Sequence, residues 1–132
     1  MIPKRLLIIE DDQEMCEEMC DTLGDDGFTL EVAQNGTDGL SLVRKHRFDI
    51  VLLDLKIPHV NGLDILDFIK KEYPQTFVII LSGSSVIKEI DEEECCVKKY
   101  FDTRIELADE VFSKPCDMRK LLAIIEERTQ PQ

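Results

Sequence analysis

The sequence predicts an α/β protein with a doubly wound, five-stranded parallel sheet. Short apolar runs alternate along the chain with stretches whose apolar residues recur at helical spacing, the order expected when helices connect parallel strands. The run 50–55, IVLLDL, is almost wholly apolar, as in a strand that is covered on both faces. With 132 residues and 43% hydrophobic content, the chain suits a single domain with one core.

Each expected element has its own local signal. Apolar runs with turn residues at their ends predict five strands, at 6–9, 28–33, 49–54, 77–81 and 111–112. Apolar stripes predict helices after the first three strands, ending near Gly24, His46 and Tyr73. Pro74 ends the third of these helices because the residue before a proline disfavours helical backbone. A last helix follows Asp117, which is its expected N-cap.

The connection between the fourth and fifth strands, residues 85–110, is about twice as long as a crossover between parallel strands needs. We expect a longer or broken fourth helix there, with an extra turn near Asp102. The acidic run 91–94, next to Cys95 and Cys96, is interpreted as the solvated face of a helix.

Composition and charge exclude several classes of protein. The 28 acidic and 16 basic side chains give a formal net charge of −12, which repels phosphate backbones and anionic lipids. Neither nucleic acid nor a membrane is therefore an expected partner. No apolar run approaches the roughly 18 residues of a membrane span, and the start of the chain turns acidic before a signal peptide could form. The protein is expected to be soluble and cytoplasmic.

The five cysteines are expected to be reduced thiols, because their number is odd and they form no C-x-x-C pair. Cys16 and Cys20 share one helix face at a spacing compatible with a metal, but no histidine or further cysteine lies nearby to complete the ligands. We interpret both as small residues of the core or its boundary.

Polar side chains follow the expected strands at their carboxyl ends. The first strand leads into Glu10 and Asp11, and the third ends in Asp54. The fourth leads into Ser82 and the fifth into Lys114. Functional sites of open α/β sheets form beyond the carboxyl ends of the strands, at a switch in strand order. We therefore expect these five residues at one edge of the sheet.

The three carboxylates of this group favour a bound cation, because like charges at close range repel strongly. Mg²⁺ suits an oxygen site with few carboxylates and several waters. The metal would attract a phosphoryl group to the same place, where Ser82 would hydrogen-bond one oxygen and Lys114 would neutralise another. Asp54 would then be the nucleophile, as carboxylates are in aspartyl-phosphate chemistry.

Four motifs, IIEDD, LLDLKIPHVNG, LSGSS and VFSKP, resemble in identity and order those of the receiver domains of bacterial-type two-component response regulators. The resemblance extends over essentially the whole chain. It implies a flavodoxin-like (βα)5 fold with strand order 2-1-3-4-5 and a lengthened connection between strands four and five. It also implies a receiver domain over residues 1–128, with 129–132 as a C-terminal tail or the start of a linker.

The resemblance assigns roles to the acidic residues. Asp54 corresponds to the phosphoacceptor of the family. Glu10 and Asp11 correspond to the acid pair that binds Mg²⁺, with Asp11 as a direct ligand and Glu10 acting through water. The backbone carbonyl of Lys56 joins the implied metal ligands, because the family uses the carbonyl two residues after the phosphoacceptor.

Ser82 and Lys114 resemble the hydroxyl and lysine residues that contact the phosphoryl group. Two departures from the family accompany them. Receivers usually have Tyr or Phe three residues before the lysine, whereas this chain has Val111 there and Phe112 one place later. The long segment 85–110 also replaces a surface through which many receivers dimerise or signal. Both the aromatic readout and the output face are therefore expected to differ.

The leading functional hypothesis is a phospho-accepting switch of a two-component phosphorelay. A histidine kinase or histidine phosphotransfer protein would donate a phosphoryl group to Asp54, and the new charge would switch an output domain or partner protein. The protein would catalyse only its own phosphorylation and dephosphorylation, and so would not be an enzyme with a diffusing substrate.

Two alternatives stay open. The first is a receiver-like interaction module that works without phosphorylation, although the complete set of site residues favours the active form. The second is a metal-dependent phosphohydrolase, which usually needs a second acid where Lys56 stands. Asp12 is assigned to helix capping, and His46 and His59 are assigned to the surface.

Overall fold

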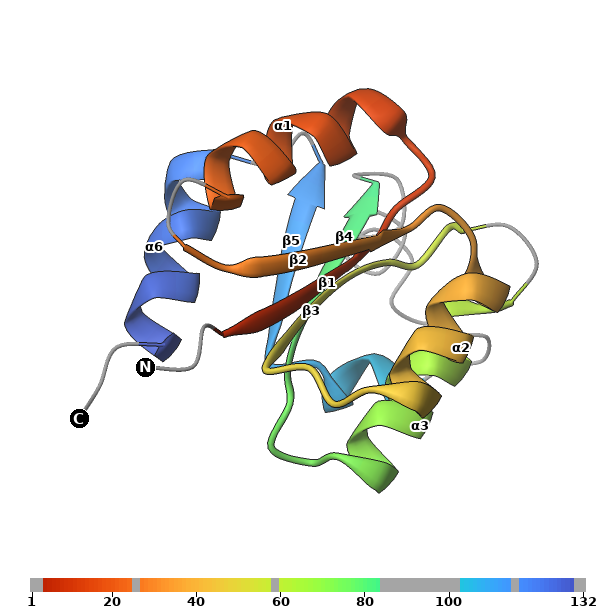
Figure 1. Ribbon diagram of the computed structural model, residues 1–132. Coiled ribbons are helices and arrows are strands. Elements are labelled where there is room, and N and C mark those ends of the chain that lie inside the picture. The colour runs from red at the N-terminus through yellow and green to blue at the C-terminus, as the bar shows by residue number, and fades with distance from the viewer. Residues whose placement is uncertain (1–3, 25–26, 58–59, 84–102, 115–116, 130–132) are drawn as a thin grey trace, which may run out of the picture.

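The computed structural model describes residues 4–24, 27–57, 60–83, 103–114 and 117–129. Five parallel strands form one sheet in the order β2-β1-β3-β4-β5 (Figure 1). The predicted fold class and strand order are therefore confirmed. The order reverses at β1, where the chain passes from β2 on one side to β3 on the other, and such a switch point is where α/β sheets bind ligands.

The strands follow the apolar runs of the sequence. Their bounds are Arg5–Ile9 for β1, Thr29–Ala33 for β2, Ile50–Asp54 for β3, Phe77–Gly83 for β4 and Glu110–Lys114 for β5. The last two are longer than predicted because their pairing continues past the apolar residues, through Ser82 with Ser113 and Gly83 with Lys114. Backbone hydrogen bonds of a ladder do not require apolar side chains, so the polar end of each strand still pairs.

Four α-helices and one 3₁₀ helix are found among the described residues. They are α1 (Gln13–Gly24), α2 (Gly36–Lys45), α3 (Gly62–Glu72), η1 (Thr103–Leu107) and α6 (Met118–Thr129). The side chain of Asn35 accepts a hydrogen bond from the Asp38 N–H, and that of Asn61 accepts one from the Leu63 N–H. Both asparagines, read in the sequence as turn or loop signals, are thus N-caps of helices.

The core has two layers, one on each face of the sheet. Figure 1 shows α1 and α6 on one face and α2 and α3 on the other. Because successive residues of a strand point to opposite faces, Leu6 and Ile8 of β1 pack toward the α1 and α6 layer, while Leu7 and Ile9 pack toward the α2 and α3 layer. All four side chains are fully buried. This double coverage explains why the strand sequences are continuous apolar runs.

The fourth helix expected within 85–110 falls mostly on residues outside those that the structure describes. The described part of the connection begins with η1, just after the position where an extra turn was expected. η1 packs against α3, and Arg104 Nη1 lies 2.6 Å from Asp64 Oδ1. The connection therefore returns to β5 along the α3 side of the sheet.

None of the described helices combines the length and the apolar character that crossing a bilayer requires.

Candidate functional site

Three carboxylates meet at the switch point of the sheet. Glu10 and Asp11 follow the last residue of β1, and Asp54 is the last residue of β3. These strands are parallel neighbours, with Ile9 opposite Leu53, so their carboxyl ends bring the acids to one place. One carboxylate oxygen from each of Glu10, Asp11 and Asp54 lies within 4.8 Å of the others. Sequence reasoning predicted this group, and the structure brings its members together.

Burial differs among the three acids. Glu10 is fully buried and Asp54 is 3% exposed, whereas Asp11 lies on the surface. Two buried carboxylates close to a third are costly unless a cation or hydrogen-bond donors compensate their charge. The site is thus partly closed by protein and open to solvent on the side of Asp11.

Backbone groups orient the two buried acids. The Lys56 N–H donates to Asp54 Oδ1 at 3.0 Å, and the Asp12 N–H donates to Glu10 Oε1 at 3.2 Å. The Glu10 N–H also continues the sheet by donating to the Ala33 carbonyl at 3.0 Å. Each acid is therefore held by the chain that follows its own strand, and the separation of the carboxylates is a property of the sheet.

The donor set fits a hard divalent cation. Carboxylate oxygens are ligands that Mg²⁺ accepts, and Mg²⁺ usually keeps several waters beside one or two carboxylates. Glu10, Asp11 and Asp54 present such oxygens with one exposed side for water. Their mutual repulsion in the absence of a cation supplies a favourable electrostatic term when one binds.

The register of the sheet places the backbone of the other two predicted residues at this edge. Asp54 is paired with Leu81, so Ser82 follows the residue opposite the proposed phosphoacceptor. Lys114 is the last residue of β5 and is paired with Gly83. Four of the five strands thus have, at or next to their last residue, a residue that the sequence had singled out.

The start of α3 is packed directly on the end of β3 and the residue that follows it. A Cβ atom on Gly62 would lie 2.9 Å from Leu55 Cα and 3.1 Å from the Asp54 carbonyl oxygen. Only glycine permits this approach, because the nearby atoms are backbone and cannot move aside. This contact was missed in the sequence, where Gly62 had only been read as part of a loop signal.

The residues assigned to other roles behave as expected where they are described. Asp12 caps α1, since its Oδ1 accepts from the Met15 N–H at 3.2 Å and its carbonyl accepts from the Cys16 N–H at 3.0 Å. His46 is exposed at the C-terminal end of α2. The prediction for His59 falls outside the described residues.

The two residues at the aromatic position lie on opposite sides of β5. Phe112 is partly buried and packs against the α1 and α6 layer of the core, whereas Val111 is 42% exposed. A shift of one residue along a strand reverses the face of a side chain. Phe112 therefore does not occupy the place of the usual aromatic residue, in agreement with the departure read from the sequence.

Cys16 lies directly beneath the acidic site. Its thiol is 4% exposed and donates to the Glu10 carbonyl at 3.2 Å, which confirms its assignment to the core. Burial, followed by the negative charge of Glu10, raises the pKa of the Cys16 thiol from 9.0 to about 11. A thiol with so high a pKa is a poor nucleophile at neutral pH.

Alkaline pH is expected to destabilise the metal-free protein partly through Cys16. The unfolded thiol ionises near pH 9, whereas the folded thiol stays protonated to about pH 11. The raised pKa therefore makes its full contribution to the free energy of unfolding below pH 9. This contribution falls as the pH rises to 11. Urea unfolding between pH 8 and pH 11 should show a smaller loss of stability in Cys16→Ala than in the wild type. Equal losses in both proteins would contradict the buried, protonated thiol.

The fold and the acidic group at its switch point define the class, a doubly wound α/β domain with three clustered carboxylates at one edge of its sheet. A family model for the response regulator receiver domain matches residues 6–126. The chain therefore belongs to the response regulator receiver domain family.

Curated relatives agree with this assignment. The transcriptional regulatory protein DltR of Streptococcus agalactiae is 31% identical over 96% of this chain and 52% of its own length. The response regulator ArlR of Staphylococcus aureus is 28% identical over 97% of this chain and 54% of its own. The chain thus spans about half the length of the curated relatives it matches.

Solved structures show the same fold. A CheY-like response regulator receiver domain protein from Methanospirillum hungatei superposes with a TM-score of 0.76 at 24% identity, covering 96% of this chain and 94% of its own. The response regulator protein TrrA of Thermotoga maritima, in complex with Mg²⁺ and BeF, gives 0.74 at 22% identity, covering 95% and 98%. At these identities the likeness establishes the fold.

Proposed function

We propose that this chain is the phospho-accepting receiver of a two-component phosphorelay and that Asp54 takes the phosphoryl group in a Mg²⁺-dependent reaction. The observation that carries the proposal is the meeting of Glu10, Asp11 and Asp54 at the switch point of a receiver fold. The relatives are response regulators, which are signalling proteins. The proposed chemistry is accordingly the transfer of one phosphoryl group onto the protein and its later hydrolysis.

The proposed metal site consists of Glu10, Asp11, Asp54 and the backbone carbonyl of Lys56. Asp11 would be a direct ligand of the metal, and Glu10 would act through water. Bound Mg²⁺ would supply charge neutralisation for the phosphoryl oxygens. One Asp54 oxygen accepts the Lys56 N–H, which fixes the orientation of the carboxylate that attacks phosphorus.

The remaining two residues would act on the phosphoryl group itself. Ser82 would donate a hydrogen bond to one oxygen, and Lys114 would pair with another. The strand register supports this assignment, because it brings the ends of β4 and β5 to the same edge as Asp54. A new dianionic group held in this way is the local charge change on which phosphorylation switches depend.

The proposed donor is a histidine kinase or a histidine phosphotransfer protein. The proposed recipient of the signal is an output domain or a partner protein. Membership of the family supports the proposed donor. Relatives about twice as long as this chain support the proposed output domain. We further propose that residues 1–128 form the receiver and that 129–132 begin a tail or linker.

Intact mass spectrometry tests the proposal directly. The protein is incubated with Mg²⁺ and acetyl phosphate, and with acetyl phosphate and a chelator as the control. A gain of one phosphoryl group that requires Mg²⁺ is the expected result. If a folded protein gains no mass from acetyl phosphate or from a phosphorylated histidine phosphotransfer protein, the phosphoacceptor function is excluded, and a receiver-like interaction module takes its place.

A further inference from the structure

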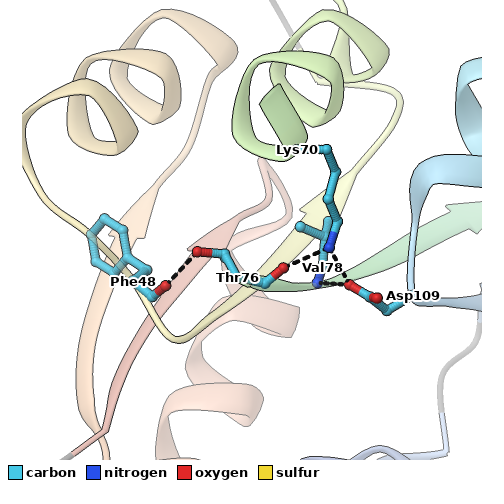
Figure 2. A network of polar contacts seen from close by, with 5 residues as sticks. All are labelled: Phe48, Lys70, Thr76, Val78 and Asp109. Carbon is cyan, nitrogen blue, oxygen red and sulfur yellow. Dashed lines mark hydrogen bonds and ion pairs between the residues drawn. The ribbon is translucent and has the colours of Figure 1, made fainter. Parts of the chain in front are cut away.

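A polar network lies at the beginning of β4, at the end of the sheet opposite the carboxylates. Figure 2 shows Lys70 of α3 donating to the Thr76 carbonyl and to the Asp109 carboxylate. The two Nζ···O distances are 2.7 and 2.6 Å. The Lys70 side chain is 13% exposed and that of Asp109 is 30% exposed. This ion pair therefore lies partly inside the protein, where charges attract more strongly than in bulk water.

Asp109 binds both backbone groups of a single residue on β4. Its Oδ2 accepts the Val78 N–H at 2.8 Å, and its own N–H donates to the Val78 carbonyl at 2.9 Å. Val78 is fully buried. A shift by one residue would break both bonds, because the backbone of the neighbouring residue, Phe77, faces β3, where its N–H donates to the Asp49 carbonyl.

The apolar residues of β5 set its alignment only weakly. Among the described strands, β5 pairs with β4 alone, over the five residues Glu110–Lys114. Of its two large apolar side chains, Phe112 packs on the core and Val111 is 42% exposed. A strand with few buried side chains is prone to slip. The pair of hydrogen bonds between Asp109 and Val78, next to the first residue of β5, supplies the alignment that the side chains do not.

The alignment of β5 matters at its other end. Lys114 is the last residue of the strand, and its partner on β4 is Gly83. A slip of one residue would move the backbone of Lys114 by about 3.3 Å along the sheet and turn its side chain to the opposite face. That displacement is as long as a hydrogen bond, so it would remove the lysine from a phosphoryl group on Asp54.

We propose that Asp109, held by Lys70, is a positioning residue that sets the register of β5 and so places Lys114 for the phosphoryl group. This inference rests on the proposed function. It assigns the Lys70 and Asp109 pair a role at a site on the opposite edge of the sheet, reached through the covalent chain of β5.

The kinetic test compares two variants that both remove polar contacts near the start of β4. Asp109→Ala removes the acceptor for Val78 and Lys70. Thr76→Val removes the buried hydrogen bond from Thr76 Oγ1 to the Phe48 carbonyl, 2.7 Å in length, and leaves β5 untouched. We expect Asp109→Ala to slow Mg²⁺-dependent phosphoryl uptake by about tenfold or more, as misplaced catalytic groups do. Thr76→Val should lower the melting temperature while retaining the wild-type rate.

Two further readouts separate positioning from general destabilisation. The affinity for Mg²⁺ should be the same in Asp109→Ala and wild type, because the acids lie at the carboxyl ends of β1 and β3. The double variant Asp109→Ala with Lys114→Ala should react no more slowly than Lys114→Ala alone, since both changes remove the same contact. Rate losses that multiply in the double variant, or equal slowing by Thr76→Val, would overturn the proposal.

A measurement of the register between β4 and β5 tests the structural part of the proposal without any phosphorylation. Cross-strand nuclear Overhauser contacts between Leu81 and Phe112, which are paired in the wild type, should weaken or change partners in Asp109→Ala. Asp109→Asn keeps an oxygen for the Val78 N–H and should preserve them, which provides a second variant if Asp109→Ala does not fold. Unchanged contacts in Asp109→Ala would overturn the proposal. If the wild type takes up no phosphoryl group, the proposed function fails, and this measurement still decides whether Asp109 sets the register.

Discussion

Replacing Asp54 by asparagine is expected to abolish phosphoryl uptake while leaving the protein folded. The amide has nearly the shape of the carboxylate and retains an oxygen for the Lys56 N–H, which donates to Asp54 Oδ1 in the wild type. It cannot act as the nucleophile that forms an acyl phosphate. Intact mass after incubation with Mg²⁺ and acetyl phosphate should show no gain in the variant.

The same substitution should raise stability in the absence of metal. Removing one of three carboxylates within 4.8 Å relieves repulsion between them, so the melting temperature in chelator should exceed that of the wild type. Stabilisation by added Mg²⁺ should be smaller in the variant. Asp12→Asn is the matched control, because Asp12 caps α1 through an oxygen that asparagine also has. Uptake by Asp54→Asn at the wild-type rate would identify a different acceptor.

Replacing Leu52 by alanine is expected to cost about 2–5 kcal/mol of unfolding free energy. Leu52 is fully buried in the middle of β3. Its neighbours in register are Ile8 on β1 and Ile79 on β4, and all three belong to the layer beneath α1 and α6. Truncation leaves a cavity at the centre of the sheet that the paired backbones cannot collapse to fill. Urea denaturation monitored by circular dichroism measures the loss.

Leu107→Ala provides the control for this prediction. Leu107 has the same side chain but is 42% exposed in η1, so its truncation should change the unfolding free energy by no more than about 0.5 kcal/mol. Comparable losses at the two positions would show that the central layer is not packed as the structure describes.

Much of the fold could be predicted from the sequence because its signals are local. Strands covered on both faces are apolar runs that stand out from the amphipathic helices between them. The acids were found for a related reason: Glu10, Asp11 and Asp54 interrupt or follow such runs, where a carboxylate is conspicuous. Chain order and the general rule for α/β switch points then brought them to one edge.

The features that were missed depend on partners far away in the chain. Lys70 and Asp109 are 39 residues apart, and neither stands in a pattern that suggests the other. The approach of Gly62 to Leu55 depends on the path of a loop, which apolar periodicity does not reveal. The extra length of β4 and β5 likewise depends on pairing between the strands, since their last residues lie outside the apolar runs.

The order of the strands also determines the sequence in which the site can be assembled during folding. β1 is the neighbour of both β2 and β3, so residues 5–54 contain three adjacent strands and all three carboxylates. β4 can then add to β3, and β5 to β4, in the direction of chain growth. A nascent chain, which folds from its N-terminal part first, would therefore form the acidic half of the site before the strand carrying Lys114 has a surface to join.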